Sequence, residues 1–326
     1  MATSLITATQ CFVPKSKEEE EQVAKTYQRY EELIIPTLPR HKGWLSEHVY
    51  MYQGYWFEPN RGLKGVMYLQ EHFKPRPTDV LIATSPKCGT TWLKALIFSI
   101  MNRATYTDMK AHPLLKYSVH ECVPFLDVHL FNTNPVGDPE ILPSPRLLCS
   151  HIAYASLPEM ARGPNGCRIV HMWRDPKDAL ISFWHFACKI RRKVAQHLPE
   201  LSLTEAFEMF SQGVSPFGPF WDQVLGYWKA SQEYPDKRLA EFLGKPFTLE
   251  EKEKRIMHEI LKLCSFESMR NAEVPEKGNF HEKLTNYHFY FRKGEVGDWK
   301  NYLTVDMARR LDEITEEKFK GTGLAI

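Results

Sequence analysis

The sequence predicts an α/β fold: a single domain with a P-loop-like parallel β-sheet flanked by helices on both sides. The apolar run Asp79–Ala83 has the character of a buried strand, and a glycine-containing turn connects it to Trp92–Met101, whose apolar residues recur at helical spacing. Two further apolar segments, Leu147–Ser150 and Arg168–Trp173, each lead into a polar turn and then a helical pattern. Such alternation is typical of a parallel sheet covered by helices. We see no repeat and no linker that would divide the 326 residues.

The N-terminal elements follow from composition and helical spacing. Residues 1–16 are rich in hydroxyl side chains and predict a disordered tail, which leaves residues 17–326 as the domain. Lys17–Leu33 is a charged amphipathic helix candidate, ended by the prolines of Pro36–Pro39. The aromatic segment Tyr50–Phe57 is too irregular to assign, and core packing or a ligand pocket would explain it equally well.

Later helices carry recognisable start signals. Asp175 supplies an N-cap and Pro176 occupies the first helical position. Ser202–Glu205 and Thr248–Glu251 both fit the capping-box pattern ahead of amphipathic segments. Arg309–Phe319 is the last predicted helix.

Overall composition excludes several classes of partner. A formal net charge of +2 gives no support for nucleic-acid binding, so any basic site must be local. No apolar run approaches the length of a bilayer span, and the N-terminus lacks the pattern of a secretory signal. The seven cysteines are scattered and include no C-x-x-C pair, which favours a reducing compartment. We therefore expect a cytosolic protein with no membrane or nucleic-acid partner.

The segment Thr84–Trp92, TSPKCGTTW, has the properties of an anion site. A turn from a strand into a helix N-terminus presents free backbone N–H groups and partial positive charge at one point. Lys87 adds a full charge, and Thr90 and Thr91 add hydroxyl donors. An ordinary strand-to-helix turn is the simpler alternative. The lysine precedes the glycine, so the nucleotide-triphosphatase pattern is not matched, and a nucleotide kinase is disfavoured.

Three more motifs carry candidate functional residues. His151 follows the second predicted strand and is either a hydrogen-bonded core histidine or a general base. Arg174, after the third strand, either pairs with a neighbouring aspartate or binds phosphate, which arginine contacts in a bidentate manner. In Phe291–Trp299, FRKGEVGDW, two cations beside a glycine form either a solvated basic turn or a phosphate-binding turn.

In this order the four motifs resemble those of the soluble sulfotransferases, closest to the plant cytosolic branch, from roughly Gly43 to Gly323. That family transfers a sulfuryl group from 3′-phosphoadenosine-5′-phosphosulfate (PAPS) to a hydroxyl, and the resemblance implies no metal. It implies His151 as the base, with Lys87 and Ser182 also catalytic. The 5′-phosphosulfate loop would comprise Lys87, Cys88, Gly89, Thr90, Thr91 and Trp92. The 3′-phosphate would be held by Arg174, Ser182, Arg292, Lys293 and Gly294, and the adenine by Cys264, Ser265 and Phe266.

Two cysteines stand at positions of interest in that resemblance. Cys88 replaces the serine of many relatives, and a helix N-terminus can lower a thiol pKa, so a nucleophilic cysteine is a minor alternative. Cys149 stands two residues before His151, where animal relatives often carry lysine. A secondary cationic role at that position is therefore in doubt.

The most serious departure follows the helix that ends near Tyr234. Relatives run there through a β-strand and a Tyr-Glu-Asp turn, whereas here Tyr234–Lys237 joins directly to Arg238–Gly244. Four residues cannot enter a sheet, pair and return. An internal strand is thus predicted to be absent, and each neighbouring backbone group left buried and unpaired would cost about 1–3 kcal/mol. We expect a shortened chain with poor stability or weak donor binding.

The resulting expectation is a PAPS-dependent sulfotransferase that acts on a small, mostly apolar hydroxyl compound. Aromatic residues around Trp56 and Phe217–Trp221 would form the acceptor pocket. Flavonoids, steroids, hydroxyjasmonates and desulfo-glucosinolates are all candidates. The alternative is a catalytically impaired pseudoenzyme. Lys300–Val305 resembles the start of a dimerisation motif, but Arg309 stands where glutamate is expected, so a monomer or a weak homodimer is predicted.

Overall fold

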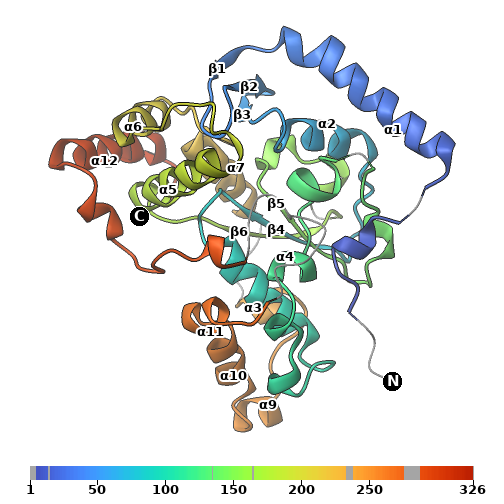
Figure 1. The fold of residues 1–326 in the computed structure, drawn as a ribbon. Helices are drawn as coiled ribbons and strands as arrows, with labels where there is room; N and C mark the ends of the chain where they lie inside the picture. Colours follow the sequence, from blue (N-terminus) through green and yellow to red (C-terminus); the bar gives the residue numbers. More distant parts are fainter. Residues whose placement is uncertain are drawn as a thin grey trace.

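A three-stranded parallel sheet lies at the centre of the molecule (Figure 1). The computed structural model describes residues 5–13, 15–133, 135–163, 165–232, 238–274 and 287–325. The strand order is β5-β4-β6, and Val80 of β4 lies opposite Leu147 on one side and Arg168 on the other. All three predicted strands are confirmed. They are β4 (Val80–Thr84), β5 (Leu147–Ser150) and β6 (Arg168–Met172).

The aromatic segment that the sequence left unassigned belongs to a small antiparallel sheet. Its strands are β1 (Arg40–Lys42), β2 (His48–Tyr52) and β3 (Tyr55–Phe57). Tyr50 pairs with Phe57 across the hairpin, and Gln53 at the turn has a φ of 52°, in the left-handed region that the tight turn requires. Trp56 and Phe57 are both buried and belong to different apolar clusters, and Trp56 shares its cluster with residues of α5 (Pro176–Val194) and α7 (Phe220–Ser231).

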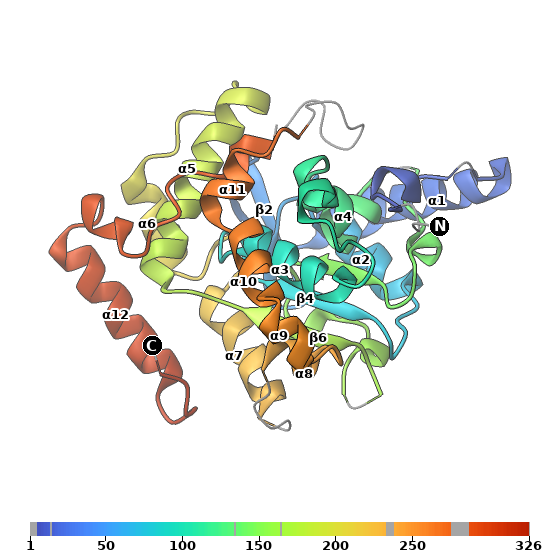
Figure 2. The same cartoon turned by 90° about the horizontal axis from the view of Figure 1, so that it is seen from below.

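Helices form the remaining layers. They are α1 (Lys17–Arg29), α2 (Leu63–His72), α3 (Thr90–Asn102), α4 (Val119–Cys122), α5 (Pro176–Val194), α6 (Leu203–Ser211), α7 (Phe220–Ser231), α8 (Leu239–Phe242), α9 (Leu249–Glu253), α10 (Ile256–Leu263), α11 (Phe266–Arg270) and α12 (Val305–Phe319). In Figure 2, α5, α6 and α12 lie together on one side of the molecule and α1 and α2 on the other. None of the helices in the described ranges combines the length and hydropathy that a bilayer span requires.

All three predicted N-caps are present, but one of the two predicted capping boxes is incomplete. The Asp175 side chain accepts a hydrogen bond from Lys177 N, and Thr248 forms a complete capping box. Ser202 caps α6 by accepting from the Glu205 amide, but the Glu205 carboxylate pairs with Lys42 instead of closing the box. α12 begins earlier than predicted because Thr304 caps it.

The two faces of the central strand contact different apolar clusters. Val80 and Ile82 pack with α3, α10 and α11, whereas Leu81 and Ala83 pack with α1 and α2. This alternation follows from the two-residue period of a strand. Because helices cover both faces, the predicted fold class is confirmed.

β6 forms one edge of the sheet. Arg168 N donates to Asp79 O, so Arg168 and alternate residues face β4, and Ile169 and His171 direct their backbone groups outward. Within the described ranges β4 is the sole sheet neighbour of β6, and every β6 residue is only half-buried. The predicted junction Tyr234–Lys237 lies outside the described residues. The absence of an internal strand therefore stays a prediction.

Part of the N-terminal segment contacts the domain. Ala8 N donates to Glu121 O at 2.7 Å, and Thr9 N donates to the Glu121 carboxylate at 3.0 Å. Ala8 and Cys11 are buried. Over residues 5–13 the chain therefore differs from the disordered tail that its composition suggests.

Candidate active site

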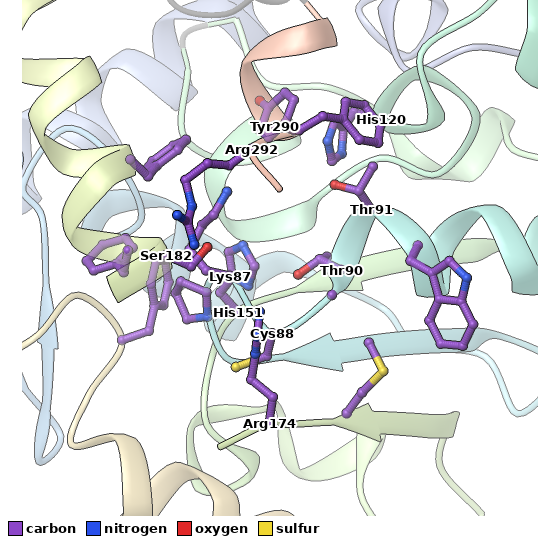
Figure 3. Close-up of a pocket in the computed structure, with 18 of the residues that line it drawn as sticks. Lys87, Cys88, Thr90, Thr91, His120, His151, Arg174, Ser182, Tyr290 and Arg292 are labelled. Carbon is purple, nitrogen blue, oxygen red and sulfur yellow. The ribbon is translucent and has the colours of Figure 1, made fainter. Parts of the chain in front are cut away.

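The four sequence motifs meet at one cavity of about 590 Å³. It lies where β4, β5 and β6 end, the edge at which open α/β sheets bind ligands. Figure 3 shows Lys87, His151, Arg174, Ser182 and Arg292 gathered around it. The predicted residues that line it are Lys87, Cys88, Gly89, Thr90, Thr91, Trp92, His151, Arg174, Ser182, Phe266, Arg292, Lys293 and Gly294.

Two predicted residues do not line the cavity. Cys264 is fully buried with its Sγ 3.6 Å from the Ser99 hydroxyl, and burial raises its pKa to about 11. Ser265 caps α11 by accepting a hydrogen bond from Ser268 N. Of this predicted segment, Phe266 alone faces the cavity.

The loop between β4 and α3 has an unusual backbone. Lys87 has a φ of 67° and Gly89 a φ of 88°, both in the left-handed region. A Cβ on Gly89 would approach Met172 Cε to 2.6 Å, so a larger residue would press the loop away from β6. Gly89 is the N-cap of α3, and the helix N-terminus therefore opens on the cavity. This geometry supports the predicted anion site.

Lys87 is a cation without an acidic partner. Its Nζ lies 4.7 Å from the Phe186 ring centroid and 5.9 Å from that of Tyr290. No carboxylate of the described residues forms an ion pair with it. Burial lowers the pKa of Lys87 to about 8, helped by the positive charges of Lys189, Arg292 and Arg174. A bound anion would relieve this repulsion.

Cys88 is not placed to act as a nucleophile. Its side chain is buried, and burial raises its pKa to about 12. The helix N-terminus and the charges of Arg174 and Lys87 do not offset that burial. The thiol stays protonated near neutral pH, so the nucleophilic alternative is disfavoured.

His151 is held in one tautomer. Its Nδ1 lies 2.8 Å from the carbonyl oxygen of Thr84, and because a carbonyl only accepts, Nδ1 must donate. Nε2 then carries a lone pair. The Asp127 carboxylate accepts from His151 N at 3.1 Å, and Gln223 donates to His151 O, so both backbone groups are also fixed. Burial lowers the pKa of the imidazole to about 3, which keeps it neutral and able to accept a proton.

Arg174 forms the aspartate pair that the sequence offered, and it also faces the cavity, where it stays a candidate for phosphate binding. Its Nη2 lies 2.8 Å from the Asp178 carboxylate, and the same side chain lines the cavity. Asp178 is buried and also accepts from the backbone amides of Gly297 at 2.8 Å and Trp299 at 3.3 Å. One carboxylate thus fixes the arginine against the fourth motif.

The fourth motif is ordered by a second buried carboxylate, Asp298. It accepts from Arg292, from Lys293 Nζ at 2.6 Å and from Asn301 at 2.9 Å. Burial alone would raise its pKa, but the bonds from Lys293, Asn301 and Arg292 hold that pKa well below its usual range. Gly294 has a φ of 74°, and a Cβ there would lie 2.5 Å from the Phe266 ring.

The rest of the cavity wall includes several aromatic residues, most of which the sequence did not predict. Phe217 was anticipated, whereas Trp56 and Trp221 are buried elsewhere and do not line the cavity. The ring centroids of Phe125 and Phe217 lie 4.7 and 5.4 Å from that of His151. The other lining residues not predicted include Arg61, His120, His129, Phe183, Phe186 and Tyr290. They come from several distant segments, and none belongs to a recognisable motif.

Comparisons with known proteins identify the family. The family model described as sulfotransferase domain matches residues 77–237 and 236–323. These two matches meet at the short junction after α7, where the internal strand is predicted to be absent. Cytosolic sulfotransferase 17 of Arabidopsis thaliana is 42% identical over 92% of this chain and 90% of its own length.

Solved structures agree with that result. A crystal structure of an Arabidopsis thaliana sulphotransferase superposes with a TM-score of 0.69 at 34% identity, and the match covers 92% of this chain and 97% of that one. The fold is shared with the mouse sulfotransferase SULT7A1, complexed with PAP, at a TM-score of 0.63 and 22% identity over 84% of this chain and 96% of that one. This chain belongs to the sulfotransferase domain family.

Proposed function

We propose that the protein transfers a sulfuryl group from PAPS to the hydroxyl of a small, mostly apolar acceptor. The observation that carries the proposal is the placement of a neutral histidine and an unpaired lysine at one cavity. His151 can accept a proton, and Lys87 can neutralise an anion. A sulfuryl transfer requires both groups, one for the attacking hydroxyl and one for the departing phosphate.

The donor would span the cavity from the loop to the fourth motif. Its 5′-phosphosulfate fits the α3 N-terminus beside Lys87, Thr90 and Thr91. Its 3′-phosphate would contact the cations and the α5 hydroxyl at the other end, namely Arg174, Ser182, Arg292 and Lys293. The adenine would lie against Trp92 and Phe266. The mouse sulfotransferase that shares this fold was solved with PAP, the desulfated form of this donor, and this supports the proposal.

The reaction follows from these positions. The acceptor oxygen attacks the sulfur, the bond from sulfur to the bridging phosphate oxygen breaks, and His151 Nε2 takes the hydroxyl proton. The products are the sulfate ester, PAP and a proton. Lys87 neutralises the charge that develops on the phosphate, which is the electrostatic contribution to the rate. The bound polyanionic donor would also raise the pKa of His151, because it stabilises the imidazolium.

The aromatic wall defines the acceptor site. Phe125 and Phe217 lie beside His151, Phe183 and Phe186 also line the cavity, and these four rings suit an apolar skeleton. Flavonoid, steroid, hydroxyjasmonate and desulfo-glucosinolate acceptors stay candidates on this basis. A cytosolic location is proposed with them, in line with the name of the Arabidopsis relative.

The open edge of β6 favours a second candidate, an impaired protein that binds donor without transfer. Incubation of the purified chain with radiolabelled PAPS and a panel of hydroxylated acceptors separates the two. Label transfer that disappears in His151→Ala supports the enzyme. Donor binding without transfer supports the impaired protein. Consumption of ATP in place of PAPS would contradict both and favour a kinase.

A further inference from the structure

Arg61 is a cation that lines the cavity but is not among the residues proposed to bind the donor. It lies in the turn between β3 and α2, where Arg61 N donates to Glu58 O at 3.2 Å, and its side chain lines the cavity. The next residue, Gly62, has a φ of 128°, and a Cβ there would lie 2.8 Å from Phe217 Cζ. Phe217 in turn lies beside His151. This chain of contacts places Arg61 on the acceptor side of the cavity.

The charge of Arg61 is not compensated by an ion pair. No carboxylate in the described ranges comes within ion-pair distance of its guanidinium. Burial lowers the pKa of Arg61, and the Tyr290 hydroxyl and then the Glu58 carboxylate act in the opposite direction. The Glu58 oxygens are already occupied, because they accept from Leu45 N at 2.8 Å, Trp44 N at 3.2 Å and the Ser46 hydroxyl. Glu58 therefore fixes the Trp44–Ser46 turn and does not pair with the arginine.

The donor-site arginines are arranged differently. Arg174 pairs with Asp178, and Arg292 pairs with Asp298. Each is held in place before any ligand arrives. Arg61 has five N–H donors and no such partner, and burial lowers its pKa. A half-buried guanidinium with unused donors gains most from a planar anion that accepts two of them.

We infer that Arg61 binds a carboxylate on the acceptor, so that the preferred acceptors are hydroxylated, otherwise apolar carboxylic acids. The inference rests on the proposed function and specifies its acceptor class. The aromatic residues would contact the carbon skeleton, His151 the hydroxyl, and Arg61 a carboxylate of the same molecule. A neutral phenol or sterol would leave the guanidinium without its anion and bind less tightly.

Equilibrium binding tests this inference independently of catalysis. We would titrate pairs of hydroxyphenyl-alkanoic acids and their methyl esters into the chain saturated with PAP, following tryptophan fluorescence. The wild-type protein should bind the acid at least about 10-fold more tightly than its ester, as expected for a charge-assisted pair. Arg61→Gln should remove the difference by weakening acid binding, with ester binding unchanged. Arg61→Lys should keep part of it, because lysine supplies charge without the bidentate geometry.

Two controls make the outcome specific. Arg192→Gln removes an exposed arginine that pairs with Glu200 on the surface, and it should leave the acid preference unchanged. The PAP affinity should be equal in the wild type and Arg61→Gln, whereas a loss there would place Arg61 in the donor site and overturn the inference. Equal binding of acid and ester to the wild type, or a preference that survives Arg61→Gln, would also overturn it. Acid binding without label transfer from PAPS would contradict the proposed function and leave the inference supported.

Discussion

The two outer strands of the central sheet both lead into the site, but their outer edges differ. On β5 the outward amide of Cys149 donates to Pro124 O at 2.9 Å, and all four strand residues are buried. On β6 the outward amides of Ile169 and His171 have no hydrogen-bond partner in the described part of the chain, and the strand is half-buried throughout. The strand that precedes the proposed base is thus enclosed, whereas the strand that precedes Arg174, the proposed phosphate ligand, has an open outer edge among the described residues.

The groups that hold the cavity residues in place also differ between the β5 side and the β6 side. The Thr84 carbonyl at the end of β4, which accepts from the His151 ring, and the Asp127 carboxylate, which accepts from the His151 amide, support His151 directly. Arg174 depends instead on Asp178, which lies on α5, and the fourth motif depends on Asp298. Side-chain bonds to two buried carboxylates therefore position the cations on this side of the cavity.

The largest effect is expected after β5. His151→Ala should lower the transfer rate by roughly 100- to 10,000-fold, the usual contribution of a general base. The affinity for PAP should stay the same, because His151 is proposed to contact the acceptor hydroxyl. Single-turnover transfer and calorimetric titration with PAP measure the two quantities. Equal transfer by the variant would remove the proposed base from the mechanism.

On the β6 side the expected effect is on binding. Arg174→Gln should weaken PAP affinity by about 10- to 100-fold, as expected for loss of a charge-assisted bond to phosphate. Transfer at saturating donor should change much less. Arg309→Gln, which removes an exposed pair with Glu313, serves as the matched control. An unchanged PAP affinity in Arg174→Gln would mean that this arginine only positions Asp178.

The dependence of kcat/KM on pH should distinguish the proposed base, His151, from the proposed cation, Lys87. His151, with a pKa of about 3, is neutral over the usual range, so kcat/KM should not fall until the pH approaches that value. Lys87, with a pKa of about 8, must be protonated to neutralise the leaving phosphate, so kcat/KM should fall about 10-fold per pH unit above it. Lys87→Arg should abolish the alkaline fall, since arginine keeps its proton. An alkaline fall that persists in this variant would assign it to another group.

The smallest effect concerns the edges themselves. In amide hydrogen exchange, Cys149 should be protected, whereas Ile169 and His171 should exchange much faster because their outward amides are unpaired. The inward amide of Val80, which donates to Arg146 O at 2.9 Å, provides a reference within the same sheet. Equal protection of the two outer strands would show that another segment covers β6.

Local sequence signals predicted the strands and most helix starts, and most residues of the candidate donor site that they indicated line one cavity. Lys87, His151 and Arg174 each follow a short apolar strand, so their proximity results from parallel strands ending at one edge. Arg61 and the carboxylate of Asp127 were not predicted, because their importance depends on contacts between segments far apart in the chain. The folding of residues 5–13 onto the domain was missed for the same reason.

We propose that this chain has a complete donor site beside an open sheet edge. Calorimetric titration of the purified protein with PAP is the decisive experiment. We expect saturable binding at one site with micromolar affinity, weakened by Lys87→Met and by Arg174→Gln. A chain that unfolds cooperatively but binds no PAP would contradict it, because the residues gathered at the cavity would then not form a donor site.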